Sequence, residues 1–524
     1  MKLPDVLRTI DSRWSGKAHA ASFGIGKLCE IECAHEILPE LCGWLRNQAD
    51  YFWSGLIVEE NPANWELRYG FYGQTHGTHI HLIAHRPIDM PTFPSIAIPV
   101  HAADWHEREA EDLFGIVFEG HPRLGDFVLH DDVWEEGAQP MRHSFDASRR
   151  AGQPNPIWRP HRVLQDPGAF AMTVGPVFSG TEESVHFLLE TVGEDVTRTI
   201  QRLFYKYRGV EKIAEGRNFA DALLLAERFA ATTAFSHALA FCQAVEEICR
   251  VGVTERALRL RVFFSELERF RHHVGTIEAI CESTALAVAA AQAGILEERL
   301  LRITGALTGH RYLFGLCVPG GLSKDLDTDQ CRKALEAVKQ IYRQLEKLGS
   351  LLKFSSSFLD RLEEVGTVSQ ENAGEIGLVG PVARASAVVR DLRQAQPYCS
   401  YDAFRFEVPS EEEGDGYARL RVLFGECLQS LRLMEQCLEG VDGGPVRIAV
   451  PIRPGATLAW SETPRGAAFH WVRLTDEGKV ARYRIVPPSF ANWLGFHLAA
   501  ENFAFQDFPI ILATFNLSVA ENDR

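Results

Sequence analysis

Residues 208–217 place five ionisable side chains immediately before a long apolar segment, residues 219–250. The five are Arg208, Glu211, Lys212, Glu215 and Arg217. So dense a group before an apolar run predicts a buried ionic cluster rather than a solvated face. A buried network of this kind is costly unless every member is paired, so we expect Arg208 and Lys212 to pair with Glu211 and Glu215.

Thiols and imidazoles could bind a metal, but their spacing argues against it. The eleven cysteines stand singly, and the closest two are Cys29 and Cys33. Zinc ribbons and iron–sulfur clusters need closer Cys-x-x-Cys grouping, so we expect reduced core thiols and no metal held by this chain alone. Four histidines within residues 76–85 follow strand spacing without a carboxylate or thiol beside them, which favours a solvated or interface strand face.

Composition indicates an ordered globular protein of two domains, since 524 residues exceed one ordinary core. The 54 basic against 70 acidic residues give a net charge of −16, which argues against binding to nucleic acid or anionic lipid. The N-terminus lacks a signal-peptide core, and no uncharged run approaches the ~20 residues that span a bilayer. We therefore expect membrane association only through partner subunits.

The elements that must position these groups fall into two parts, with an α+β fold overall. Residues 1–145 predict a small α/β-sheet domain, and residues 146–168, with four prolines, predict a linker. In the first part, helical spacing covers 34–48 and 105–114, and strand patterns cover 51–59, 65–72, 78–86 and 96–100.

Residues 169–524 predict a larger, mainly α-helical bundle with short peripheral strands. Two strands precede the helices, at 171–177 and 186–189. Long helical patterns then cover 219–250, 254–282, 284–309, 327–353 and 411–439. A short-stranded tail over 447–471 and a last apolar run at 508–515 complete this part.

Motifs along the chain resemble two subunits of one family. Residues 103–115 (ADWHEREAEDLFG) resemble the signature helix of the 30-kDa-type subunit of respiratory complex I, and 120–122 (GHP) and 139–142 (QPMR) continue the likeness. From about residue 171 the chain resembles the 49-kDa-type subunit of complex I and the large subunit of formate-hydrogenlyase-type (group 4) [NiFe] hydrogenases. The fused arrangement looks closest to the hydrogenlyase branch.

The motifs that carry the second resemblance are spread over the whole large part. They are 208–212 (RGVEK), Arg269 with His272-His273, 319–322 (PGGL), 380–386 (GPVARAS), 390–393 (RDLR), 462–466 (ETPRG) and 521–524 (ENDR). The resemblance implies a hydrogenase-large-subunit-like bundle for this part of the chain.

The resemblance breaks down where a nickel centre needs thiolates. Two Cys-x-x-Cys pairs hold nickel in the hydrogenase branch, because soft thiolates suit that chemistry. Here the first pair aligns with Ala230 and Thr233, and the second with Ser518 and Glu521. We therefore expect no nickel and no hydrogen activation by this chain.

Complex I uses the corresponding cavity for a quinone headgroup, held by a His on an early Gly-Pro hairpin and a Tyr on the first long helix. Here residues 175–180 (GPVFSG) contain no His, and the Tyr position falls on about Ala231. Neither usual donor is present, so quinone binding would need other groups.

The resemblance also suggests roles for the remaining polar residues. The Glu that matches Glu211 lies on a proton path in hydrogenases, a role that needs a carboxylate able to change protonation state; a salt bridge between two elements is an equal alternative. His237, near the vacated site, is a candidate for proton transfer, with a satisfied core His as the alternative. Arg208, Arg384 and Arg390 are candidates to line the cavity or to face an iron–sulfur partner.

The resemblance implies a subunit of a membrane-associated, complex-I-like or hydrogenlyase-like oxidoreductase without a [NiFe] centre. The expected partners are a small subunit with a [4Fe–4S] cluster and membrane ion-translocating subunits, on the cytoplasmic side of the cell membrane. Quinone is one candidate acceptor, and any NAD dependence would belong to other subunits. The alternative is a non-catalytic scaffold; Phe178 and Phe229 filling the space beside Glu211 and Ala231 would favour it, and a polar cavity there would favour the enzyme.

Overall fold

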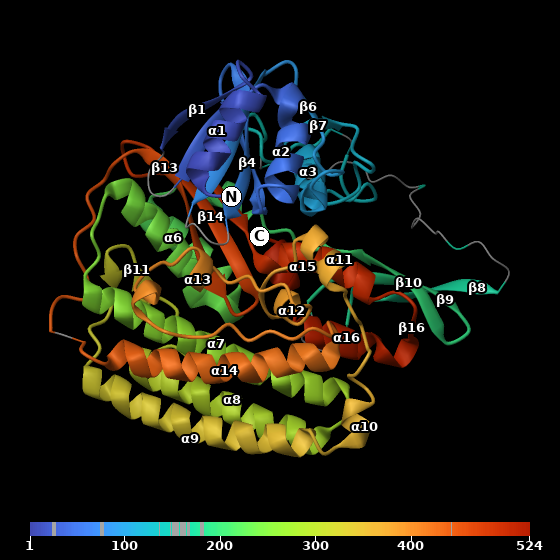
Figure 1. Cartoon of the computed structure of the whole chain (residues 1–524), viewed down its shortest axis with the longest axis vertical. Coiled ribbons are helices and arrows are strands. Elements are labelled where there is room, and N and C mark those ends of the chain that lie inside the picture. Colours follow the sequence, from blue (N-terminus) through green and yellow to red (C-terminus); the bar gives the residue numbers. More distant parts are fainter. Residues whose placement is uncertain are drawn as a thin grey trace.

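The computed structural model describes residues 1–23, 28–73, 78–135, 137–146, 148, 157, 164, 168–178, 183–441 and 443–524. Figure 1 shows a sheet-rich N-terminal part above a helical bundle, with the C-terminus lying between them. The predicted α+β class is confirmed. Most of the predicted linker, 146–168, lies outside the described residues.

The N-terminal part is built on a five-stranded sheet in the order β1-β2-β5-β4-β3, in which only the β2–β5 pairing is parallel. Its strands are β1 (Ala18–Phe23), β2 (Leu28–Cys33), β3 (Tyr51–Glu60), β4 (Asn64–Gly73) and β5 (His79–Pro87). Around them lie α1 (Leu3–Arg13), η1 (His35–Ile37), α2 (Leu38–Asn47), β6 (Thr92–Pro94), η2 (His101–Ala103), α3 (Asp104–Phe114) and β7 (Val117–Glu119).

The predicted strand at 96–100 is wrong, because this segment forms a turn. The carboxylate of Glu107, on α3, accepts the backbone N–H of Ile96 at 2.7 Å and the hydroxyl of Ser95 at 2.5 Å. A side chain thus satisfies a backbone donor that a sheet ladder would otherwise pair.

The bundle is built on long helices. In the lower part of Figure 1, α7 (Glu255–Ser283), α8 (Ala287–Thr308), α9 (Thr328–Leu352) and α14 (Gly416–Leu438) lie side by side, and α6 (Ala234–Cys249) lies above them. Shorter elements around them are α4 (Val210–Ala214), α5 (Phe219–Arg228), η3 (Ala231–Thr233), β11 (Cys317–Val318), β12 (Gly321–Leu322), α10 (Ser356–Leu359), α11 (Gln370–Ile376), α12 (Gly380–Arg384), α13 (Leu392–Ala395) and η4 (Tyr401–Ala403). Between α14 and the end of the chain lie α15 (Pro488–Ala499), η5 (Phe505–Asp507), α16 (Phe508–Phe515) and α17 (Val519–Asn522).

The helix predicted over 219–250 is divided in two. Helix α5 ends at Arg228, and α6 begins at Ala234 after a short 3₁₀ turn. The buried carboxylate of Glu268, on α7, accepts the backbone N–H groups of Phe235 and Ser236 at 2.8 and 3.0 Å. A helix starts where an acceptor satisfies the free backbone N–H groups of its first turn. For α6 this acceptor is Glu268, from a distant part of the chain.

Two further sheets flank the bundle. A three-stranded sheet of β13 (Gly455–Thr463), β14 (Gly466–Leu474) and β15 (Val480–Val486) lies against the five-stranded sheet. A four-stranded sheet projects from the body (Figure 1) and contains β8 (Ala169–Val174), β9 (His186–Val192), β10 (Asp195–Arg202) and β16 (Phe503–Ala504).

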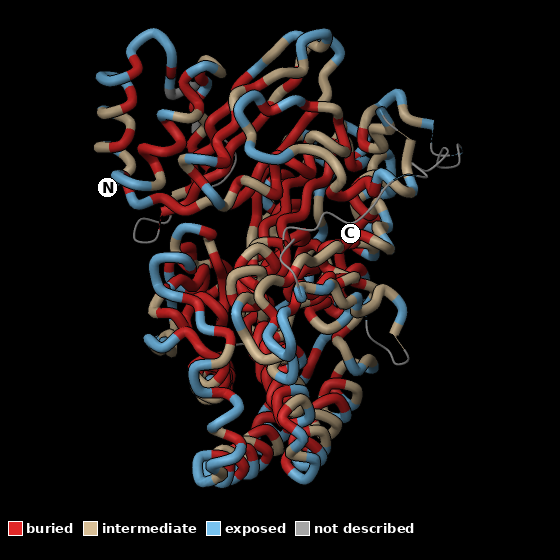
Figure 2. Tube along the Cα trace, turned by 90° about the vertical axis from the view of Figure 1, so that its right-hand side faces the viewer, coloured by how far each residue is buried: buried red, intermediate tan, exposed pale blue. Residues whose placement is uncertain are grey.

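Burial continues across the junction of the two parts, where buried segments run from one into the other (Figure 2). Interdomain pairs there include Glu59 on β3, which accepts hydrogen bonds from Trp471 at 3.1 Å and from Arg473 at 3.0 Å. Within the described ranges, none of the helices combines the length and apolarity needed to cross a membrane.

The histidines of β5 lie at this junction. His79 and His81 are fully buried, with ring centroids 4.3 Å from Trp460 and 5.4 Å from Trp471. Of the two kinds of strand face expected, an interface face therefore describes His79 and His81, and a solvated face describes only the exposed His85. His76 lies outside the described residues. Among those residues, no group of three or more His, Cys, Asp or Glu could hold a metal.

His79→Leu is expected to make the protein less sensitive to acid. Burial lowers the pKa of His79 to about 3, and neither ring nitrogen has a partner among the described residues. The unfolded chain therefore binds the extra proton between pH 6.5 and 3, and the folded chain loses stability as the pH falls through that window. Relative to pH 7.5, this group should cost about 2 kcal/mol at pH 5.

Urea unfolding at pH 7.5 and pH 5 measures this effect. His85→Leu, at the exposed end of the same strand, is the matched control and should keep the wild-type pH dependence. An unchanged pH dependence in His79→Leu would contradict the expectation.

Candidate functional site

The four positions that match nickel ligands in the hydrogenase branch approach one another in a buried polar site. Ala230 and Thr233 lie at the break between α5 and α6, while Ser518 and Glu521 lie at α17. The Thr233 hydroxyl donates a hydrogen bond to Glu521 Oε1 at 3.1 Å. The terminal carboxylate site is the name we give to Thr233, His237, Arg465, Ser489 and Glu521.

Arg208 holds the two segments of this site together. Its Nε donates to the Asp523 carbonyl at 2.9 Å, and its Nη2 donates to the carbonyls of Phe229, at 2.9 Å, and Ala520. The expectation that Arg208 pairs with Glu211 or Glu215 is therefore wrong. Burial lowers the pKa of Arg208, and three carbonyl acceptors replace the expected carboxylate.

Glu521 is fully buried, and its carboxylate accepts hydrogen bonds from neighbouring side chains. Arg465 Nη1 donates to it at 3.1 Å, and the Ser489 hydroxyl donates at 2.6 Å. Burial alone raises the pKa of a carboxyl group, but here Arg465 and the neighbouring His237 and Ser489 outweigh it and lower the pKa of Glu521 to about 2. Glu521 is therefore an anion at neutral pH.

The donor set does not fit a nickel–iron centre. Ala230 supplies a methyl group, Thr233 and Ser518 supply hydroxyls, and Glu521 supplies a carboxylate already engaged by Arg465. Thiolates are the ligands that nickel–iron chemistry needs, and these four positions contain none. The same residues instead make a site that holds a negative charge.

His237 connects Glu521 to two further buried groups. Its Nε2 lies 3.7 Å from Glu521 Oε1, and its Nδ1 lies 3.1 Å from Nε2 of His470 on β14. The other nitrogen of His470, Nδ1, lies 2.8 Å from the hydroxyl of Tyr483 on β15. Glu521, His237, His470 and Tyr483 thus form a row of proton-exchanging groups in the interior.

Burial sets the charge states along this row. It lowers the pKa of His470 well below its usual value and raises the pKa of Tyr483 well above its own. Both groups are neutral at pH 7, so a proton that moves between His237 and Tyr483 would pass through neutral hydrogen-bonded groups. His237 thus lies in this site, near the vacated positions as the sequence suggested, and contacts His470, a partner that its spacing could not identify.

Glu211 lies in a second cluster, at the junction of the two parts. Arg524 Nε and Arg484 Nη1 approach its Oε1 at 3.1 and 3.3 Å, and the backbone N–H of Ile485 donates to the same atom at 2.9 Å. Arg484 and Arg524 also bind Glu109 on α3, at 2.5 and 2.7 Å. We call Glu109, Glu211, Arg482, Arg484 and Arg524 the interdomain ion cluster.

This arrangement favours the salt-bridge alternative for Glu211. Burial raises the pKa of Glu109, but Arg484 and Arg524 outweigh it and lower that pKa, so two carboxylates face guanidinium groups inside the protein. The predicted Lys212–Glu215 pair is present at 3.0 Å, with Arg482 3.5 Å from Glu215. The cluster joins the 103–115 motif to both the 208–212 and 521–524 motifs.

The interface role suggested for Arg384 is wrong, because this side chain is fully buried within the chain. Arg384 binds Glu426 at 2.6 Å and Glu462 at 3.0 Å. Arg390 is also buried, with its guanidinium 3.6 Å from the centroid of the Phe52 ring. Neither arginine contacts the terminal carboxylate site.

Arg384 belongs to a third group, the bundle ion cluster. Its members come from α7, α12, α13, α14 and β13 and are buried. They are Glu266, Arg269, His273, Arg384, Asp391, Arg393, Glu426 and Glu462.

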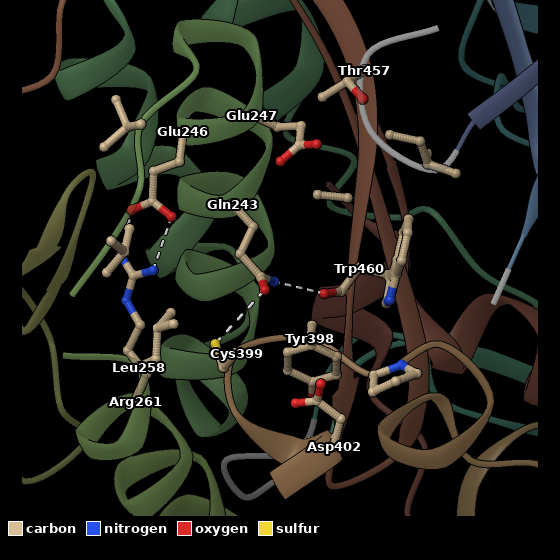
Figure 3. A pocket seen from close by; sticks show the side chains of 15 residues that line it. Gln243, Glu246, Glu247, Leu258, Arg261, Tyr398, Cys399, Asp402, Thr457 and Trp460 are labelled. Atoms are coloured by element: carbon tan, nitrogen blue, oxygen red, sulfur yellow. Dashed lines mark hydrogen bonds and ion pairs between the residues drawn. The ribbon is translucent and has the colours of Figure 1, made fainter. Parts of the chain in front are cut away.

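Three cavities formed by described residues have no member of these clusters in their lining. The one in Figure 3, of about 380 Å³, lies between α6 and β13; Gln243 and Cys399 face each other there, with Sγ 3.7 Å from Oε1. A cavity of about 580 Å³ lies beside α5, and one of about 500 Å³ lies beside α3. None of these three is lined by Glu211, His237 or Glu521.

Several residues of these sites lack a recognisable signal in the sequence. Glu109 lies within the 103–115 motif, which gives it no individual role. Glu521 is singled out in the sequence only because it occupies a thiolate position. His470 and Arg484 carried no motif, because their importance depends on strands 233 and 273 residues from their partners His237 and Glu211.

Comparisons with known proteins agree in both halves of the chain. Residues 31–151 match the family described as the 30 Kd subunit of respiratory-chain NADH dehydrogenase, and residues 293–454 and 448–524 match its 49 Kd subunit. Formate hydrogenlyase subunit 5 of Escherichia coli (strain K12) is 29% identical over 442 residues, covering 83% of this chain and 77% of that protein. The C/D subunit of NADH-quinone oxidoreductase from Bdellovibrio bacteriovorus is 27% identical over 467 residues, 82% of each chain. Hydrogenase-4 component G of Escherichia coli (strain K12) is 27% identical over 441 residues, covering 83% and 76%.

Proposed function

The chain belongs to the respiratory-chain NADH dehydrogenase family, as a fused 30-kDa-type and 49-kDa-type subunit of a complex-I-like oxidoreductase, and we propose that its terminal carboxylate site serves proton transfer in that complex. Partner subunits follow from this membership. We further propose that they include a small subunit with a [4Fe–4S] cluster and membrane ion-translocating subunits, on the cytoplasmic side of the membrane.

The observation that carries the proposal is the row of buried groups from Glu521 to Tyr483. A carboxylate, two imidazoles and a phenol follow one another at 3.7, 3.1 and 2.8 Å. Buried polar groups of this kind are costly to keep, and the row begins at the position where relatives of the hydrogenase branch would hold their metal. Proton transfer is the chemistry that such a row can perform.

The acceptor site that we propose lies where this row approaches the surface. Ala231 is exposed, and Thr232 is half-buried beside it, while the side chain of Arg465 keeps 9% exposure. Arg465 Nη1 donates to the Thr232 hydroxyl and to Glu521, both at 3.1 Å, and Nε donates to the Asn516 carbonyl at 2.7 Å, so Nη2 is the nitrogen that would donate to a carbonyl ligand. A quinone is the acceptor we propose, since its reduction consumes two electrons, supplied through the iron–sulfur partner, and two protons.

The scaffold alternative has two observations in its favour, and the first is that none of the three cavities is lined by Glu211, His237 or Glu521. Phe229 is buried and packs on His237, with ring centroids 4.5 Å apart. Apolar side chains do not, however, replace the polar surroundings of Glu521, which accepts hydrogen bonds from Thr233, Arg465 and Ser489. The retained polar site therefore supports the catalytic proposal better.

Purification of the native complex with metal analysis and a quinone-reductase assay tests the proposal. We expect iron without stoichiometric nickel, and electron transfer to a water-soluble quinone. Stoichiometric nickel bound to this subunit would overturn the proposed chemistry. An assembled complex that transfers no electrons to quinone or to an artificial acceptor would establish the scaffold alternative.

A further inference from the structure

The motifs that the proposed function does not use meet in the bundle ion cluster. Arg269 and His273 come from α7, Arg384 from α12, Asp391 and Arg393 from the 390–393 motif, and Glu462 from the 462–466 motif. Their carboxylates outnumber their guanidinium groups, since Glu266, Asp391, Glu426 and Glu462 face Arg269, Arg384 and Arg393. Every one of these side chains is at most 5% exposed. Burial also lowers the pKa of His273, the remaining titratable cation of the cluster, against the opposing effect of Glu426, so one negative charge has no cationic counterpart.

Two of the four carboxylates, Glu266 and Glu426, are well satisfied. Glu266 accepts from Arg393 at 3.1 Å, and from the Tyr401 and Ser430 hydroxyls at 2.6 Å each. Glu426 accepts a hydrogen bond from Arg384 Nε at 2.8 Å and lies 2.8 Å from His273. These contacts stabilise the anions, so the surplus charge does not belong to either carboxylate.

Glu462 has the weakest set of partners. Its Oε1 accepts from Arg384 Nη1 at 3.0 Å, but that nitrogen also donates to the Arg390 carbonyl at 2.7 Å and lies 3.5 Å from Asp391. Its Oε2 accepts the backbone N–H of Leu392 at 3.0 Å. Asp391 itself is held by Arg393 at 2.6 Å, so the unbalanced position is Glu462.

We propose that Glu462 carries the proton of this cluster and is a second proton-exchanging residue of the enzyme, linked to Glu521 by the turn of residues 462–466. This inference deepens the proposed function and, in its link to Glu521, rests on it. Burial and then the charge of Asp391 raise the pKa of Glu462 to about 7, against the opposing effect of Arg384, Arg269 and Arg393, which agrees with the geometry. The phenol of Tyr398 also faces this residue, where it accepts the backbone N–H of Glu462 at 2.9 Å.

The turn gives the two sites a short and rigid connection. Arg269 donates to the carbonyls of Glu462 and Thr463 at 2.5 and 2.9 Å, and Arg465 binds Glu521 at 3.1 Å. A Cβ atom on Gly380, whose φ is +69°, would lie 2.0 Å from the Arg465 carbonyl, so α12 packs directly on the turn. A change of charge at Glu521 therefore acts on Arg465 and reaches Glu462 through three fixed residues.

Infrared spectroscopy of the purified full-length chain tests the proton assignment. Burial also raises the pKa of Asp112 and of Asp523 to about 7, so the readout is the difference between the wild-type and Glu462→Gln spectra, in which their bands cancel. This difference should contain the carbonyl band of one protonated carboxylic acid, which disappears with a midpoint near pH 7, whereas the control Glu477→Gln, at an exposed position in the β14–β15 turn, should give no such difference. A wild-type minus Glu462→Gln difference without a band that titrates near pH 7 would overturn the assignment.

The link to Glu521 has its own readouts. Arg465→Gln should shift the midpoint of the Glu462 band, and an unshifted midpoint would overturn the link. In the assembled complex, Glu462→Gln should flatten the pH dependence of turnover around pH 7, and Glu462→Asp should restore it; a purely structural role would change turnover equally at every pH. A complex without turnover would refute the proposed function, while the infrared titration would still decide whether Glu462 holds the proton.

Should Glu462→Gln fail to fold, Asp391→Asn gives the second measurement. Removing that neighbouring charge should lower the midpoint of the Glu462 band. An unchanged midpoint would contradict the assignment.

Discussion

Arg484→Met is expected to destabilise the protein by about 3–5 kcal/mol, the usual cost of removing one partner from a buried ion pair. Arg484 Nη2 binds Glu109 at 2.5 Å, and its Nη1 lies 3.3 Å from Glu211. Methionine keeps much of the volume but removes the charge, so two buried carboxylates would remain with Arg524 as their main counter-ion. Chemical unfolding of the full-length chain measures the loss.

The expected loss belongs to the interdomain contact, because Glu109 lies on α3 and Glu211 on α4. Combining Arg484→Met with Glu109→Gln should therefore cost clearly less than the sum of the two single substitutions. Lys479→Met, which breaks an exposed pair with Glu477 beside β15, should change stability by less than about 1 kcal/mol. Strict additivity of the first two substitutions would show that Arg484 and Glu109 do not stabilise each other.

The sequence predicted most helices and strands because their patterns are local, and it failed where a distant side chain decides the outcome. The apolar pattern over 219–250 is continuous, yet Glu268 on α7 begins a new helix at Ala234. Likewise, Glu107 replaces the strand expected at 96–100 by a turn. Neither acceptor can be identified from the segment that it reshapes.

The candidate site shows the same division. Residue types identified Glu211 and His237, and the spacing correctly predicted the Lys212–Glu215 pair. For Glu211, however, the cations that are close in sequence are not its partners. Glu211 pairs with Arg484 and Arg524, which come from the end of the chain. The motif resemblance assigned these segments to one family, but only the fold shows which of their charged side chains are in contact.

The second large effect concerns turnover rather than stability. Glu521→Gln is expected to lower electron transfer to quinone by about 10²-fold or more in the assembled complex, the range typical of a lost proton-transfer group. Glutamine has nearly the same shape, but it removes the anion that Arg465 and His237 face. Glutamine also has one acceptor oxygen instead of two, so it cannot replace both Oε1, which accepts from Thr233, and Oε2, which accepts from Ser489.

His237→Phe should produce a loss of similar size, and the double variant should be little worse than either single one, because both residues act in one row. Glu211→Gln is the informative contrast. Since Glu211 pairs with Arg484 and Arg524 at the junction, Glu211→Gln should lower the free energy of unfolding. The complex that still assembles should keep most of its turnover. Turnover should be measured per assembled complex, with the amounts of all subunits checked in each preparation. Wild-type turnover in Glu521→Gln and His237→Phe, together with a large loss in Glu211→Gln, would move the proton path from α6 to the interdomain ion cluster.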